Sequence, residues 1–114
     1  MLFRLTTQAA VGIISNMMAV QLLRNRVVYS ETAFSELVLW QVPKPVPGSK
    51  HRYKYRLAYV VNAECVIRYD NEEGKGDHRH VSGRESPYRF STPEQLLRDF
   101  QRDIVRWNHE NRDA

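Results

Sequence analysis

The chain has 114 residues, of which 42% are hydrophobic, and these values fit one compact domain with a single core. A formal charge of +4, from 17 basic against 13 acidic residues, favours an anionic partner. The single cysteine, Cys65, excludes an internal disulfide and any zinc site built from several cysteines, which is typical of proteins of the reducing cytoplasm, where we expect this one to act.

The N-terminal segment has apolar residues at helical spacing between positions 5 and 24, which predicts a helix. The alternative is that residues 1–16 are an extension and that one domain covers residues 17–114. Residues 9–20 are apolar but too few to span a bilayer, and no secretory signal is recognisable. We therefore expect no membrane span.

The next part of the chain is rich in β-branched and aromatic residues, which predicts strands at 27–29 and 33–42. Three prolines between positions 43 and 47 exclude a central strand there, so we expect an extended loop over 43–50. Trp40 and Cys65 are interpreted as core residues, because both lie in apolar runs.

Residues 53–61 alternate with period two, which predicts a strand with tyrosines on one face and basic residues at the start of the other. We interpret the tyrosine face as part of the core rather than as a platform for stacking bases. Residues 65–70 are expected to return antiparallel after a turn at Asn62-Ala63. A two-residue and a three-residue turn are both compatible with the sequence, and the longer one pairs the apolar residues better.

The C-terminal part contains a candidate strand at 80–82 and then a helix. Thr92, Pro93 and Gln95 have the spacing of a capping box, and an apolar stripe follows at Leu96, Leu97, Phe100, Ile104 and Trp107. The helix should end near Glu110 and pack on the sheet. The expected fold is α+β, with a mainly antiparallel sheet of four or five strands covered by this helix.

The run of residues 74–80 is the strongest functional signal, because it combines two imidazoles, two fixed cations and a carboxylate with two glycines. Histidine exchanges a proton near neutral pH, and Lys or Arg stabilises charge that develops on a phosphate. The alternative is a polar hairpin loop with its charges in water. The candidate catalytic residues are Lys75, Asp77, His78, Arg79 and His80.

Neither a metal nor another cofactor is expected at this run. His78 and His80 could share one ion on a strand, but a third ligand would have to come from His51 or His109. Arg79 between the two histidines would repel a cation.

Cleavage of RNA without a metal needs a base, an acid and cations around the phosphate. Because two histidines on one strand reach both sides of a phosphate poorly, one of them is expected to act with Tyr88, His51 or Asp77. The candidate substrate-binding residues are the remaining cations, a tyrosine and a histidine: Arg68, Arg89, Tyr88, Arg56, Lys54, Arg52 and His51.

Six segments resemble the TumE family of small prokaryotic toxins: residues 22–24, 34–43, 55–61, 68–72, 74–80 and 88–90. The similarity covers about positions 20–110, and the run 74–80 is its most specific part. It implies the toxin of a type II toxin–antitoxin pair and, as partner, a helix-turn-helix antitoxin. Ribonuclease activity is an analogy with toxins of this size.

Two other functions stay open. A non-catalytic toxin would block RNA, the ribosome or another target through its basic surface and the proline-rich loop. An antitoxin-like or structural subunit is the third alternative, although no DNA-reading helix is recognisable. Self-association as a homodimer is open as well, and the sequence does not identify the RNA target.

Overall fold

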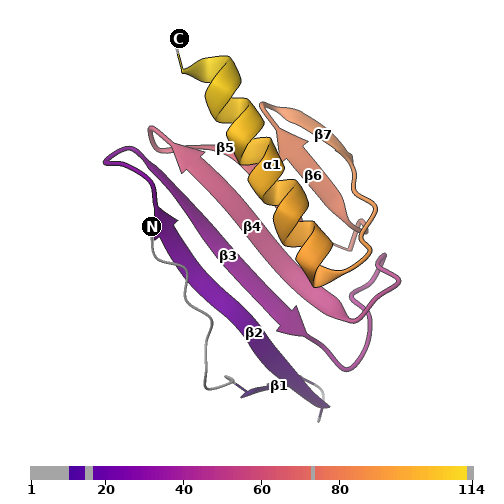
Figure 1. Ribbon diagram of the computed structural model, residues 1–114. Helices are drawn as coiled ribbons and strands as arrows, with labels where there is room; N and C mark the ends of the chain where they lie inside the picture. Colours follow the sequence, from indigo (N-terminus) through magenta and orange to yellow (C-terminus); the bar gives the residue numbers. More distant parts are fainter. Residues whose placement is uncertain (1–10, 15–16, 73, 113–114) are drawn as a thin grey trace.

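The computed structural model describes residues 11–14, 17–72 and 74–112, which form one antiparallel sheet with a helix across one side (Figure 1). Seven neighbouring strands follow the order of the chain. They are β1 (Val11–Ile14), β2 (Met17–Val28), β3 (Ala33–Gln41), β4 (Tyr53–Val61), β5 (Glu64–Asp70), β6 (His78–Val81) and β7 (Arg84–Pro87), and helix α1 (Pro93–Asn111) comes last. The predicted α+β class and antiparallel sheet are confirmed, whereas four or five strands was too few.

The predicted N-terminal helix is wrong wherever the chain is described, because β1 and β2 occupy that region as strands. The register of β2 explains part of the error. Gln21 pairs with Trp40 while Leu23 pairs with Leu39, so Leu22 is an extra residue in a bulge. The bulge breaks the period of two within β2, whereas the apolar residues at positions 10, 13, 14, 17 and 18 precede it. Positions 1–10 lie outside the described residues.

The core lies between the sheet and α1. Leu37, Leu57 and Tyr69 stand opposite one another on β3, β4 and β5, and all three are buried. α1 packs its own buried apolar residues, Leu96, Phe100 and Ile104, into the same cluster. Tyr55 and Tyr59 belong to this cluster too, so the interpretation of the tyrosine face as core is confirmed. No helix of the described chain covers the other side of the sheet, which we call the open face.

The hairpin between β4 and β5 combines both turn lengths that the sequence allowed. Val61 pairs with Glu64 across a two-residue turn at Asn62-Ala63, where both residues have positive φ. A bulge at Val66 then shifts the register by one residue. As a result Tyr59 faces Ile67, which is the apolar pairing that a three-residue turn would have given.

The proline-rich loop packs against the segment that precedes β6. A Cβ atom on Gly48 would lie 2.5 Å from the Gly76 nitrogen and 2.8 Å from the Gly74 oxygen, and Gly48 has φ +91°. The glycines of the run 74–80 therefore let two backbones approach each other. This packing fixes where β6 begins.

α1 begins where the capping box predicted, because the Thr92 hydroxyl accepts a hydrogen bond from the Gln95 backbone NH at 3.0 Å. The helix ends at Asn111, one residue beyond the predicted end. Within the described residues, no helix has both the length and the apolar character needed to cross a bilayer.

Candidate functional site

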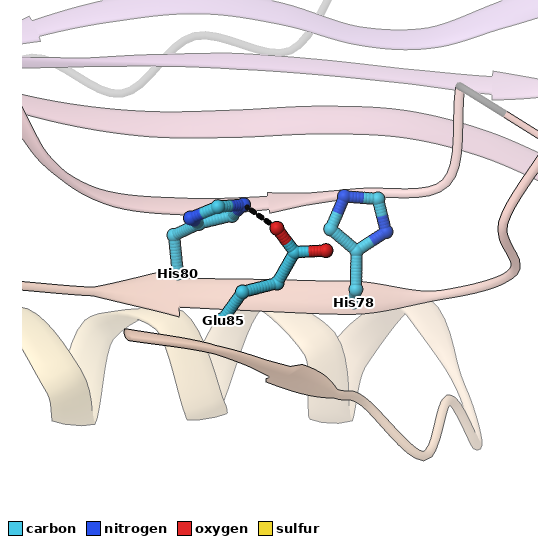
Figure 2. A group of neighbouring side chains, drawn as sticks. All are labelled: His78, His80 and Glu85. Atoms are coloured by element: carbon cyan, nitrogen blue, oxygen red, sulfur yellow. Dashed lines mark ion pairs between the residues drawn. The ribbon is translucent and has the colours of Figure 1, made fainter. Parts of the chain in front are cut away.

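Strand β6 separates the chemistry-bearing run into two groups. Because side chains alternate along a strand, His78 and His80 point to the open face, whereas Arg79 points toward α1 and contacts Asp103 there at 3.0 Å. Figure 2 shows both imidazoles on the same side of β6, with the Glu85 carboxylate between them. The candidate site is therefore the histidine pair and its neighbours on the open face.

His78 is 5% exposed, and each of its ring nitrogens faces an oxygen atom. Its Nδ1 lies 3.1 Å from the Gly76 carbonyl oxygen, and a carbonyl only accepts, so Nδ1 carries the proton. Its Nε2 faces Asp70 Oδ1 at 3.1 Å. The other Asp70 oxygen lies 2.9 Å from Arg68 Nε. Asp70 thus links the first histidine to a cation of the same face.

His80 is more accessible, with 27% of its side chain exposed. Its Nε2 lies 2.8 Å from Glu85 Oε2, and the register of β6 with β7 places these two residues directly opposite each other. The centroids of the His78 and His80 rings are 5.8 Å apart. Both rings are therefore close enough to contact one small ligand.

Glu85 is a site residue that the sequence reasoning missed, since β7 is short, fully exposed and lacks apolar alternation. The Ser82-Gly83 pair was the available signal. A two-residue turn with positive φ at both positions, as found here, puts the fourth residue after Val81 opposite His80.

The basic residues predicted from the period of β4 do reach the open face. Arg56 lies opposite Asp70, which in turn lies opposite His78, so the three form one row across β4, β5 and β6. Lys54 and Arg56 also line a shallow groove together with Arg24 and Trp40. Trp40 is half-buried in this groove, so its interpretation as a core residue is wrong.

A second correction concerns Cys65, which is exposed rather than part of the core. It lies opposite Val60 beside the β5 bulge, and the bulge rather than the apolar run decides which residue turns inward.

Asp77 immediately precedes β6 and belongs to a hydrogen-bond network that joins the loops. It accepts hydrogen bonds from Ser49 Oγ, His51 Nε2 and Tyr55 OH, each at 2.6 Å. The His51 ring also stacks on Phe90, with centroids 3.8 Å apart. Burial, together with the bond to Asp77, raises the pKa of Tyr55 above its ordinary value. Asp77 and His51 are thus placed together, away from the histidine pair.

A further polar network lies under α1. Tyr69 OH donates to Asp103, the same carboxylate that contacts Arg79. Tyr88 OH donates to Asp99 at 2.6 Å, and burial and this bond raise the pKa of Tyr88. These contacts direct Arg79 and Tyr88 toward the helix.

The remaining predicted site residues lie in connecting segments. Lys75 is exposed in the segment before β6, Arg52 is exposed just before β4, and Arg89 is exposed between β7 and α1. The structure therefore brings together five of the predicted residues on the open face: His78, His80, Arg68, Arg56 and Lys54.

Three residues on this face lie close enough to hold a metal ion together. One donor atom each from His78, His80 and Glu85 lies within 4.8 Å of the other two. The residue that joins the two histidines in this group is thus Glu85, not His51 or His109. The expected repulsion from Arg79 does not apply, because that side chain contacts Asp103 on the opposite side of the sheet.

Comparison with known proteins identifies the class of this small α+β chain. Residues 17–108 match the model of a family described as Toxin TumE. Because the match covers most of the chain, the protein belongs to the TumE toxin family, and the predicted resemblance is confirmed. Neither the curated proteins nor the solved structures include a significant match.

Proposed function

We propose that the protein is the growth-inhibiting toxin of a type II toxin–antitoxin pair and that it cuts RNA on the open face without a metal ion. The observation that carries this proposal is the placement of His78 and His80 on one face with Arg68 and Arg56. Family membership supports toxicity, and the chemistry of these side chains supports RNA as the target.

The proposed reaction is an internal transesterification. One imidazole takes the proton of the ribose 2′-hydroxyl, and the 2′-oxygen then attacks the adjacent phosphorus. The bond from phosphorus to the 5′-oxygen breaks, and an imidazolium gives that oxygen a proton. The products are a 2′,3′-cyclic phosphate and a 5′-hydroxyl end, so atoms and protons balance. No oxidant or other reactant is required.

The two histidines are assigned to the two proton transfers because they lie on the open face beside Arg68, whereas the other candidates contact residues of the loops and of α1. Asp77 and His51 bind each other at 2.6 Å, and Tyr88 donates to Asp99. His80, the more exposed ring, meets the substrate first. His78 lies deeper on the same face, and its contact with the Gly76 carbonyl sets the orientation of its ring.

The open face also offers contacts for the rest of the strand. Arg68 lies opposite His80 and can hold the scissile phosphate, where fixed positive charge stabilises the developing negative charge. Arg24, Lys54 and Arg56 around Trp40 provide cations beside an aromatic ring, which is a common arrangement for single-stranded nucleic acid. A cognate helix-turn-helix antitoxin would inhibit by covering this face.

The test is incubation of the purified protein with total RNA in excess chelator, comparing the unchanged protein with His80→Ala. We expect fragments with cyclic phosphate ends from the unchanged protein and a loss of about 10²- to 10⁴-fold in the variant. His80 is partly exposed, so the variant should keep its melting temperature.

The matched control is His109→Ala, which removes an exposed histidine from α1 and should cut RNA normally. Intact RNA from unchanged protein that still arrests growth would overturn cleavage and favour a toxin that blocks its target by binding. Normal cleavage by His80→Ala would overturn the assignment of the site.

A further inference from the structure

The geometry points to a second ligand for the open face: we propose that His78, His80 and Glu85 bind one divalent transition-metal ion of the zinc type. Two imidazoles and a carboxylate are a common set of protein ligands for zinc and its neighbours. They come from adjacent strands, His78 and His80 from β6 and Glu85 from β7, so the backbone ladder fixes their relative positions.

The spacing of the donor atoms suits such an ion after a small adjustment. Tetrahedral zinc with bonds of about 2.0–2.2 Å needs ligand atoms about 3.3–3.6 Å apart. His80 Nε2 and Glu85 Oε2 are 2.8 Å apart, and all three donors lie within 4.8 Å. The Glu85 side chain is 43% exposed and belongs to a hairpin, so it can move toward His78 without disturbing the core. Figure 2 shows its carboxylate already between the two rings.

The orientation of His78 is the second observation. Because Nδ1 donates to Gly76, the lone pair of the neutral ring is on Nε2, which faces the open side of the sheet beside Asp70. Ligand histidines in metal sites usually donate their other ring nitrogen to a carbonyl or carboxylate in this way. The Gly48–Gly76 packing holds the carbonyl in place.

The polar atoms of the cluster are also unsatisfied. His78 Nε2, His80 Nε2 and Asp70 Oδ1 are buried and make no aligned hydrogen bond with any described residue. His78 Nε2 faces the Asp70 carboxylate at 3.1 Å, a contact that is attractive when Nε2 carries positive charge. Either a proton on Nε2 or a metal ion bound to it supplies that charge.

Two carboxylates lie next to the imidazoles. Asp70 and Glu85 contribute two negative charges, and these are offset by Arg68, which contacts Asp70, and by Arg56, which lies opposite Asp70. Water enters on the side of the exposed Glu85, so an ion has a path to the site.

The Asp77 network shows what a histidine–carboxylate cluster looks like when it is complete without an ion. His51 Nε2 donates to Asp77, and His51 Nδ1 accepts from the Tyr53 backbone NH. No lone pair of that ring remains for a metal. The described residues thus include a saturated and an unsaturated histidine–carboxylate cluster, and the unsaturated one is the proposed metal site.

Metal binding would also regulate the toxin, an extension that rests on the proposed function. An imidazole whose lone pair binds zinc can neither take the 2′-hydroxyl proton nor, once its own proton is displaced, give one to the leaving oxygen. We therefore expect Zn²⁺ to inhibit RNA cleavage.

The test measures metal binding directly and uses no RNA. Untagged protein is titrated with Zn²⁺ against a chromophoric chelator, and with Co²⁺ to follow the visible d–d bands of a tetrahedral site. We expect one ion per chain. Glu85→Gln and His80→Gln should each weaken binding by about tenfold or more.

Two substitutions of the same chemical kind serve as controls. Glu36→Gln removes a carboxylate from the open face on β3, and His109→Gln removes an exposed histidine from α1. Both should bind like the unchanged protein. Absence of binding, or equal weakening in the controls, would overturn the metal site whatever the result with RNA.

The regulatory extension is tested separately by adding Zn²⁺ to the RNA assay and comparing each protein with its own rate in chelator. The unchanged protein should be inhibited, and Glu85→Gln should need at least about tenfold more zinc. Activation by zinc would overturn inhibition and also metal-independent cleavage, while the binding result would stand.

Discussion

The two sides of the sheet treat their polar residues differently. On the side of α1, two carboxylates have several aligned donors: Asp77 accepts from three side chains, and Asp99 accepts from Tyr88 and Gln95. On the open face, His78 and His80 lie at ion-pair distance from carboxylates without aligned hydrogen bonds. Saturated networks stabilise a fold. An unsatisfied polar atom in a native structure instead indicates strain, a catalytic role or a bound water or ion.

The same difference between the two sides is seen among neighbouring residues at strand β6. Asp77 and Arg79 are tied to loops and helix, while His78 and His80 point the other way. The two groups should therefore respond differently to substitution. Changes on the side of α1 should lower stability, and changes on the open face should lower binding or activity at nearly constant stability.

The largest expected effect on stability follows from Asp77→Ala. This change leaves Ser49, His51 and Tyr55 without their common acceptor, and one unsatisfied buried group costs about 1–3 kcal/mol. We expect the free energy of unfolding to fall by about 3 kcal/mol or more, measured by urea denaturation.

The matching change on the open face is Glu85→Ala, which removes a half-exposed ion pair and should cost about 1 kcal/mol or less. Equal losses for the two variants would contradict the difference between the sides. A stable Asp77→Ala protein without toxicity would instead return Asp77 to the catalytic site.

A smaller effect is expected from acid. Burial raises the pKa of Asp99, but the hydrogen bonds that it accepts and two nearby arginines outweigh burial, so this pKa lies below its ordinary value of 3.8. The folded state therefore favours the carboxylate, and the stability it contributes is present above the ordinary pKa and lost as pH falls through the folded one.

Asp99→Asn should flatten the loss of stability between about pH 5 and pH 2. Urea denaturation across this range measures it, with Glu110→Gln, an exposed acid on α1, as the control. An unchanged slope in Asp99→Asn would show that other carboxylates govern acid unfolding.

The sequence predicted the parts of the fold that depend on local chemistry. Three such features are confirmed by the structure: the Thr92 cap, the apolar stripe of α1 and the period of β4. The β2 bulge at Leu22 and the β5 bulge at Val66 were hidden because a bulge is set by the partner strand. The β2 bulge accounts for part of the wrong prediction of an N-terminal helix, and the β5 bulge accounts for the wrong placement of Cys65.

The residue types of the candidate site were predictable from the sequence, but the division of these residues between the two sides of the sheet was not. The run 74–80 was recognisable as chemistry, yet only the start of β6 decides which of its side chains share a face. Glu85 required the Ser82-Gly83 turn to be read as a hairpin. Trp40 was assigned to the core because it is hydrophobic. A strand that is buried on one side can carry hydrophobic residues on both sides, so hydrophobicity alone does not show which side a residue occupies.

The smallest expected effect is the loss of one phosphate contact from the open face. Arg56→Gln should weaken the binding of single-stranded RNA modestly and reduce the slope of log affinity against log salt by about 0.7, the value for one contact. Arg106→Gln is the control, because it removes the same charge from the exposed side of α1. Fluorescence anisotropy at several salt concentrations measures both slopes. Equal slopes for the two variants would mean that RNA binding depends on net charge alone. That result would contradict the proposal that the open face binds RNA.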